Sequence, residues 1–203
     1  MAPRMQNRPG FTMIEMAIVA GVIALLAAVA LPNINFRGFE MDANTRNLQN
    51  QILASQTISV QNNKYVLLTF VYCNSQFRIV VDSNKNKGYD SGERRYWKTL
   101  SEGAKFVIPP STIDGYSPYY VTGPGIIGYN NVAATNGRTC SNSPSVWLYP
   151  TGSTSGDVVV YLGPASTNPR NQDYRAVQMY GATGKIHVWR MQSNGTWKKS
   201  DMQ

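Results

Sequence analysis

One apolar run near the N-terminus constrains this 203-residue chain more than any other feature. The run extends from Phe11 to Leu31 and contains a single charged residue, Glu15, close to its start. At about 1.5 Å per residue, a helix over this run is ~31 Å long, which matches the hydrocarbon core of a bilayer. An ionisable side chain at that depth costs roughly 3 kcal/mol even on insertion-based scales, so it needs a partner. We therefore predict a transmembrane helix whose carboxylate is specifically paired.

Two ordinary segments share this outline. A secretory signal peptide has a basic start, here Arg4 and Arg8, then an apolar stretch and a small-x-small cleavage site, which Ala28-Val29-Ala30 satisfies. A permanent single-span anchor requires only the apolar run. Neither gives a reason for an acid at position 15. Two arginines precede the run and only Arg37 closely follows it, which predicts a cytoplasmic leader with the rest of the chain outside.

The residues around Glu15 resemble the class III signal of type IV pilins and pseudopilins. The match comprises a short basic leader ending at Gly10, the segment Phe11-Thr12-Met13-Ile14-Glu15-Met16, the apolar run and then Pro32. The resemblance implies that a prepilin peptidase cuts after Gly10 and N-methylates Phe11. Glu15 then guides assembly by neutralising the Phe11 ammonium of a neighbouring subunit. The resemblance also implies a single-pass protein of the inner membrane that an assembly platform builds, with other pilin subunits, into an extracytoplasmic filament.

The remaining chain is predicted to contain a second helical part and a β-rich head. Residues 1–10 form the leader, 11–32 the transmembrane and assembly helix with a bend at Pro32, and 33–62 its amphipathic continuation. In that continuation Leu48, Ile52 and Ser55 recur at helical spacing and should pack on the head. Residues 63–203 form the head, with predicted strands at 65–72, 76–82, 95–100, 105–108, 146–149, 158–162, 175–180 and 185–190. The predicted fold class is α+β, one long N-terminal helix on an antiparallel sheet.

Three segments of the head resemble the GspH/FimT branch of pilin-like proteins, which are minor subunits of type IV pili and type II secretion pseudopili. They are Val81–Glu93, Leu148–Gly152 with the following Gly156–Val159, and the turn at Gly184-Lys185-Ile186. The resemblance implies a minor pilin or pseudopilin and no enzyme. It does not separate the two filament systems. The long, irregular segment 109–144 resembles no known family.

An acidic turn is the candidate metal site. Lys87 stands where a calcium-binding loop has its sharp-turn glycine, and Lys85 and Lys87 oppose a divalent cation. The alternative is a hairpin loop whose Asp and Asn side chains bond their own backbone. The sequence indicates no cofactor other than calcium at this candidate site. The oxygen donors that follow the spacing of a calcium loop are Asp82, Asn84, Asn86, the Gly88 carbonyl, Asp90 and Glu93.

Cys73 and Cys140 are the two cysteines of the chain. Thiols outside the membrane meet an oxidising environment, which favours a disulfide between them. Such a bridge closes a loop of about 68 residues and contributes roughly 4 kcal/mol in the chain-entropy model. The alternative is two unpaired small hydrophobic residues, because no metal-ligand or Cys-x-x-Cys spacing is present.

The C-terminal region is the candidate nucleic-acid site. Here phosphates would contact cations while bases stack on Trp189 and Trp197. Some FimT-like pilins act in DNA uptake through a basic patch near the C-terminus, but their arginine-rich element is replaced here by Gly184-Lys185-Ile186-His187. The alternative is a solvated hairpin with the tryptophans packed beneath it. The candidate cations are Lys185, Arg190, Lys198 and Lys199.

Catalysis is not predicted. The sole histidine, His187, alternates with Ile186 and Val188 on a predicted strand and is expected at the surface without a partner. No nucleophile elbow or phosphate-binding glycine loop is present. Besides a filament subunit, two functions stay open: a DNA-binding minor pilin in natural transformation, and a soluble exported binding protein. Salt-sensitive DNA binding and the first residue of the mature chain distinguish them.

Overall fold

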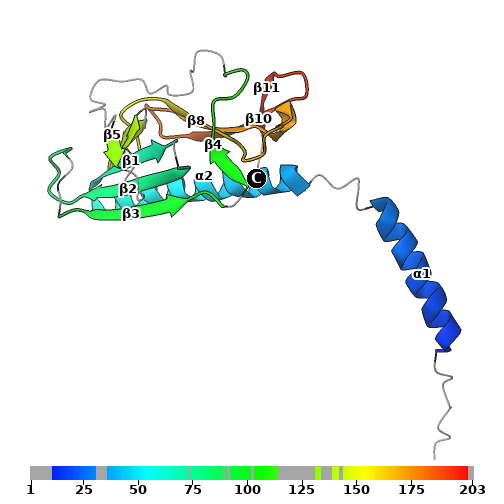
Figure 1. Cartoon of the computed structure of the whole chain (residues 1–203). Helices are drawn as coiled ribbons and strands as arrows, with labels where there is room; N and C mark the ends of the chain where they lie inside the picture. Colours follow the sequence, from blue (N-terminus) through cyan, green and yellow to red (C-terminus); the bar gives the residue numbers. More distant parts are fainter. Residues whose placement is uncertain are drawn as a thin grey trace, which may run out of the picture. The chain divides into compact units, whose positions relative to one another are not determined.

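The structure is a computed structural model that describes residues 11–30, 36–72, 74–88, 90, 92–101, 103–113, 131–133, 139–141 and 144–200. The chain separates into two compact units, Met1–Phe36 and Arg37–Gln203. The first contains helix α1, and the second contains nearly all of helix α2 together with every strand (Figure 1).

Helix α1 (Met13–Ala30) consists almost wholly of aliphatic residues. Its 18 residues make a helix of about 27 Å. Within the residues that the structure describes, no helix is both long and apolar enough to cross a membrane. The predicted transmembrane character of residues 11–32 is therefore not supported.

Helix α2 (Phe36–Asn62) buries one stripe of side chains. The predicted members Leu48, Ile52 and Ser55 are all buried, and Met41 and Ser59 extend the stripe in both directions. The helix ends where Asn63 adopts a left-handed backbone (φ 51°), a conformation that Asn tolerates better than most residues. Within the predicted helix over 11–62, the described residues form α1 and α2, and residues 31–35 between them are not described. The predicted bend at Pro32 lies outside the described residues.

Two antiparallel sheets form the rest of the second unit. The four-stranded sheet has the order β3-β2-β1-β7, and the five-stranded sheet has the order β11-β10-β9-β8-β4. A separate hairpin pairs β5 (Asn131–Ala133) with β6 (Thr139–Ser141). The first sheet contains β1 (Tyr65–Val71), β2 (Gln76–Asp82), β3 (Arg94–Thr99) and β7 (Ser145–Leu148). The second contains β4 (Ala104–Phe106), β8 (Val158–Pro164), β9 (Arg175–Met179), β10 (Ile186–Met191) and β11 (Trp197–Ser200).

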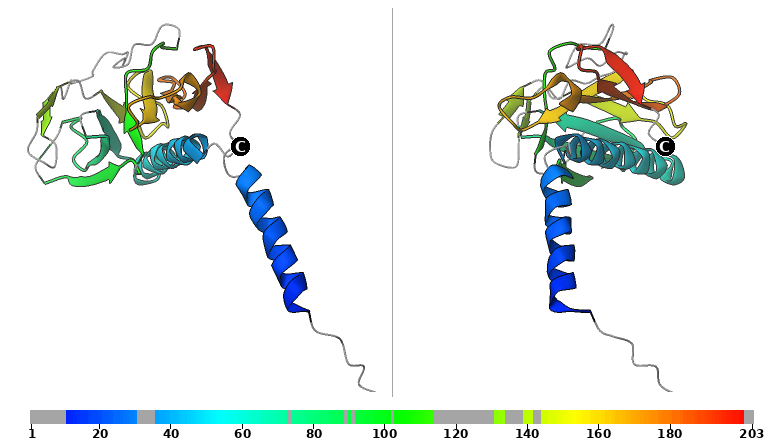
Figure 2. Two further views of the ribbon diagram at one scale, coloured as in Figure 1. Left: turned by 45° about the vertical axis from the view of Figure 1, so that its right-hand side comes forward. Right: turned by 90° about the vertical axis from the view of Figure 1, so that its right-hand side faces the viewer.

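One apolar core joins α2 to both sheets. The stripe of α2 packs with Phe70 and Phe77 of the four-stranded sheet and with Val160 and Val177 of the five-stranded sheet. The helix lies against the same side of the strands in all three ribbon views (Figures 1 and 2). This arrangement confirms the predicted α+β class, a helix packed on antiparallel sheet, although the strands are divided between two principal sheets.

The opposite face of each sheet has a smaller cluster of its own. On the five-stranded sheet this cluster contains Ile113, Tyr161 and Ala176, with Trp189 and Trp197 packed against it. On the four-stranded sheet it contains Leu67, Val80 and Trp147. Both faces of each sheet are thus covered in part, which leaves few strand residues fully exposed apart from β3.

The sequence prediction was wrong about two parts of the head. Segment 109–144, expected to be irregular, contains the β5–β6 hairpin. Strand β11 was not predicted, because Trp-Lys-Lys-Ser has no alternation of buried apolar residues. It forms through backbone pairing with β10, in which Trp189 lies opposite Lys199 and Met191 opposite Trp197.

Candidate functional site

The first turn of α1 holds the predicted assembly residue, Glu15. Its Oε2 accepts hydrogen bonds from the backbone N–H of Thr12 (2.8 Å) and from the Thr12 hydroxyl (2.9 Å). The backbone N–H of Glu15 in turn donates to the hydroxyl oxygen of Thr12 (3.3 Å). These reciprocal bonds are a capping box, in which Thr12 is the N-cap and Glu15 the third helical residue. The Thr-x-x-Glu spacing of a capping box is visible in the sequence and is the signal for this local partner of the acid.

The surface of α1 is apolar on every side. Ten large hydrophobic side chains between positions 11 and 26 are exposed, including Phe11 at 85% and Met13 at 93%. A helix that is hydrophobic all round is normally covered, either by protein or by lipid. Phe11 and Glu15 therefore lie at the start of a helix that needs a partner surface. Gly10, the predicted processing residue, lies outside the described residues.

The acidic turn is closed by its own hydrogen bonds. The two carboxylate oxygens of Asp82 accept the backbone N–H groups of Lys85 (2.6 Å) and Lys87 (2.8 Å). Both lysines adopt positive φ, at 62° and 56°. Asp90 accepts the side-chain amides of Asn84 (2.6 Å) and Asn86 (2.8 Å). The carboxylates thus face donors of the loop itself, as in the hairpin alternative.

Glu93, the last residue of the predicted calcium site, also accepts hydrogen bonds from backbone N–H groups. Its two oxygens accept the N–H groups of Ser83 (3.1 Å) and Asp90 (3.3 Å). Burial raises the pKa of Glu93, backbone hydrogen bonds oppose that rise, and the nearby carboxylates of Asp82 and Asp90 add to it. The Gly88 N–H bonds the Asn86 side chain at 2.6 Å. Among the described side chains, no three His, Cys, Asp or Glu residues are grouped so as to hold a metal ion.

The structure divides the four predicted DNA-contacting cations between the two faces of the five-stranded sheet. Arg190 and Lys198 lie opposite each other across β10 and β11, on the face toward α2. Lys199 lies opposite Trp189 on the other face, and Lys185 precedes β10. Both Lys199 and Lys185 are close enough to His187 to act on its charge. No single face of the described strands therefore presents all four cations.

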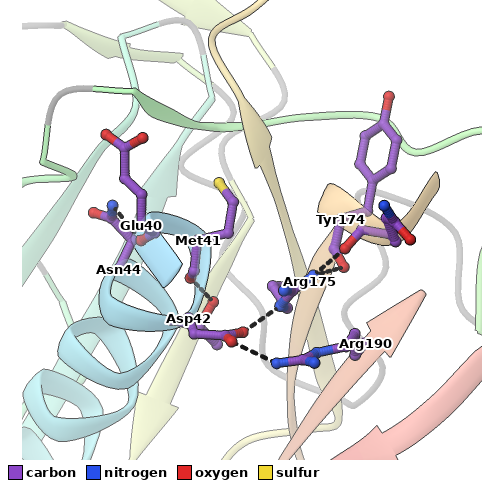
Figure 3. Close-up of polar contacts among 9 residues, drawn as sticks. Glu40, Met41, Asp42, Asn44, Tyr174, Arg175 and Arg190 are labelled. Atoms are coloured by element: carbon purple, nitrogen blue, oxygen red, sulfur yellow. Dashed lines mark hydrogen bonds and ion pairs between the residues drawn. The ribbon is translucent and has the colours of Figure 1, made fainter. Parts of the chain in front are cut away.

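Arg190 has an internal partner that the sequence did not indicate. Asp42 of α2 accepts the Nε of Arg175 (2.6 Å) and a terminal nitrogen of Arg190 (2.5 Å), which ties the helix to β9 and β10 (Figure 3). The Arg175 side chain is 2% exposed, and it also donates to the carbonyls of Gln172 (2.6 Å) and Tyr174 (2.9 Å). Burial lowers the pKa of Arg175, and the bond to Asp42 opposes that shift.

His187 lies on β10 as predicted, and its side chain is half-buried. Both ring nitrogens are buried and, within the described part of the chain, neither has a hydrogen-bond partner. The ring packs edge-on against Tyr180, with centroids 5.0 Å apart. Burial lowers the pKa of His187, and the charges of Lys199 and Lys185 lower it further.

The predicted disulfide lies outside what the structure describes. Cys73 is not among the described residues, and for Cys140 only its place in β6 is given. The pairing of these two cysteines stays a prediction.

Comparisons with known proteins agree with the N-terminal features. Residues 5–31 match the prokaryotic N-terminal methylation motif. The pilin-like protein PilA1 of Thermus thermophilus is 30% identical over 88 residues, which cover 43% of this chain and 56% of that protein. The chain therefore spans just over half the length of this curated relative.

Two solved structures of the minor pseudopilin EpsH, from the type II secretion system of Vibrio cholerae, show a weaker likeness. They are 13% and 11% identical, cover 79% of this chain and 94% and 92% of EpsH, and both give a TM-score of 0.39. The decisive features are the methylation motif, the PilA1 match, and the exposed apolar helix capped by Thr12 and Glu15. The N-terminus of this chain carries the prokaryotic N-terminal methylation motif, and part of the chain is similar to a pilin-like protein.

Proposed function

We propose that the protein is a minor subunit of a type IV pilus or of a type II secretion pseudopilus, of the GspH/FimT kind. In this proposal a prepilin peptidase cuts after Gly10 and methylates Phe11. The precursor is held at the inner membrane, and the assembly platform then moves it into an extracytoplasmic filament. The single observation that supports this most is a methylation motif over residues 5–31 leading into an uncovered apolar helix.

The proposed assembly interaction pairs Glu15 of one subunit with the methylated ammonium of Phe11 in its neighbour. Phe11 is exposed and only four residues from Glu15, so the two charges lie at the same end of α1. Stacked α1 helices would cover each other's apolar side chains and bring the acid of one subunit to the amine of the next. An ion pair removed from water is favourable only when both charges are matched.

The first test is the N-terminus of the mature protein. Intact-mass and N-terminal analysis of the exported form should give N-methyl-Phe11 as its first residue. A chain that begins at Leu31 would instead indicate an ordinary secretory signal peptide and a soluble exported protein. A chain that keeps residues 1–10 would refute processing.

The capping box allows the charge of Glu15 to be separated from its helix-capping role. Glu15→Gln keeps an acceptor for Thr12 but removes the charge, whereas Thr12→Ala removes the hydroxyl cap and keeps the charge. Loss of the cap costs α1 about 1 kcal/mol. Filament yield, measured in sheared surface fractions, should fall at least tenfold with Glu15→Gln and stay near wild type with Thr12→Ala. The opposite order would mean that Glu15 acts through the helix cap alone.

A further inference from the structure

A pocket of about 520 Å³ lies on the face of the five-stranded sheet that points away from α2. Its floor includes Gln178 and Trp189, which alternate along β9 and β10 with the core residues Val177 and Val188. One wall is the segment 111–113 that follows β4, and the other is the β10–β11 hairpin through residues 195–197. The volume is within the range of about 300–1,000 Å³ typical of small-molecule sites.

Two indole rings line this pocket and are held in place by hydrogen bonds. Trp189 Nε1 donates to Gln178 Oε1 (2.8 Å), and Trp197 Nε1 donates to the Ser111 carbonyl (3.0 Å). Trp197 also packs on Tyr161, with ring centroids 5.4 Å apart. Because the polar atom of each indole is already used, the ring surface left for the pocket is apolar. Fixed aromatic surfaces bind a ligand with little loss of side-chain entropy.

A buried amide supplies a donor beside these rings. Gln178 is 2% exposed, and its Oε1 is occupied by Trp189. The same side chain lines the pocket. The Nε2 group of an amide side chain is a hydrogen-bond donor, so a ligand with an oxygen acceptor suits this part of the lining. Thr112 and Thr196 add hydroxyl groups at the rim.

The lining that the structure describes carries no formal charge. Burying a charged group against this lining would leave its charge unmatched by the lining itself, so the lining favours a neutral group. The phosphate of a nucleotide would have to reach Lys199, which lies opposite Trp189 outside the lining. These features suit a neutral ligand with one apolar face and polar edges.

We propose that this pocket binds a neutral sugar residue, either as a free sugar or as part of a glycan chain. The C–H groups on one face of a pyranose ring are weakly positive and fit the negative face of an indole. The hydroxyl or acetamido oxygens at the ring edge would accept from Gln178 and exchange hydrogen bonds with the threonines. The proposed pairing of Glu15 with Phe11 uses no residue of this pocket, so the proposed function does not depend on the outcome.

The test uses the full chain in lauryldimethylamine oxide, because the common maltoside detergents carry sugars themselves. Binding of glucose, N-acetylglucosamine, cellobiose and chitobiose is followed by tryptophan fluorescence and by saturation-transfer NMR of the sugar. Saturable binding of at least one of them at millimolar concentrations is expected. Tighter binding of disaccharides, with cosedimentation on chitin or cellulose, identifies a glycan chain, and equal binding of monosaccharides identifies a free sugar.

Variants then locate the binding site. Trp189→Ala should weaken binding at least tenfold, whereas Trp97→Ala, on β3 of the other sheet, should leave it unchanged. Trp189 also packs in the apolar cluster, so its loss can unfold the sheet. Thr112→Trp fills the pocket from an exposed position and should abolish binding while circular dichroism stays that of wild type. No saturable binding of any of the four sugars, or equal binding by Thr112→Trp and wild type, overturns the proposal.

Discussion

Replacing Asp42 by alanine should reveal how strongly α2 is fastened to the five-stranded sheet. The carboxylate lies between Arg175, whose side chain is 2% exposed, and Arg190, whose side chain is 43% exposed. Removing one member of a buried ion pair costs about 3–5 kcal/mol, because the other charge is left without compensation. Two carbonyls still accept from Arg175 in the variant. The expected loss is therefore near the lower end, about 3 kcal/mol of unfolding free energy.

Two further variants of the same network show how much of the stability loss comes from burial of the charge and how much from the ion-pair contact itself. Arg190→Ala removes the ion pair between Arg190 and Asp42, whose N–O distance is similar to that of the Arg175 pair. Because the Arg190 side chain is exposed, the variant should lose at most about 1 kcal/mol of unfolding free energy. The double variant Asp42→Leu with Arg175→Met replaces the buried pair by apolar residues, and such exchanges are often neutral or stabilising. We expect the double variant to recover most of the stability lost by Asp42→Ala.

The assay is urea unfolding of the full chain in a non-ionic detergent, followed by tryptophan fluorescence. Trp189 is on β10, the strand that carries Arg190, and so reports on the sheet that Asp42 holds. Equal slopes of free energy against urea must accompany the shifts if they are to be read as stability changes. A loss below about 1 kcal/mol for Asp42→Ala, or one equal to that of Arg190→Ala, would refute the argument from burial.

Three shorter tests concern a pair of glycines, Asp82 and His187. Gly184→Ala should cost more than Gly152→Ala: both glycines have positive φ, but only at Gly184 would the new Cβ meet a backbone oxygen, at 2.0 Å. Thermal unfolding of the pair should show the Gly152 variant losing about 1–2 kcal/mol, the cost of a left-handed non-glycine residue, and the Gly184 variant more. Asp82→Asn should lower the free energy of unfolding by about 1–2 kcal/mol, because an amide accepts only one of the two buried backbone hydrogen bonds that the carboxylate accepts, and added calcium should not change that loss. The folded-state pKa of His187 lies below its ordinary 6.5, so the unfolded chain binds the proton more readily and stability is lost as the pH falls below 6.5. His187→Gln should flatten that part of the stability profile, and an unchanged slope would show that other groups cause it.

Local patterns in the sequence were enough to predict much of the second unit. Phe77, Ile79 and Val81 alternate with more polar positions, and they belong to one buried face of β2. A one-residue slip would turn all three to the other side, so the pattern fixes the register of the strand as well as its existence. The stripe of α2 was equally clear because Leu48 and Ile52 repeat at helical spacing.

Features that depend on distant pairing could not be predicted in this way. Strand β11 has no apolar alternation and is defined by its neighbour β10. Asp42 and Arg175 are separated by 133 positions, and nothing in the residues around either one indicates the other. The burial of the His187 ring nitrogens also depends on distant packing, since an alternating strand does not show which of its faces another segment covers.

The capping box changes how the energetics of Glu15 should be understood. The pairing predicted from the sequence places the whole cost of the acid on the contact with a neighbouring subunit. In the structure Thr12 already donates two hydrogen bonds to it. The proposed pairing with Phe11 of another subunit must therefore compete with this local interaction rather than rescue an unsatisfied charge. Under the proposed assembly, the gain from pairing is the difference between the ammonium of the neighbour and the Thr12 donors that Glu15 already has.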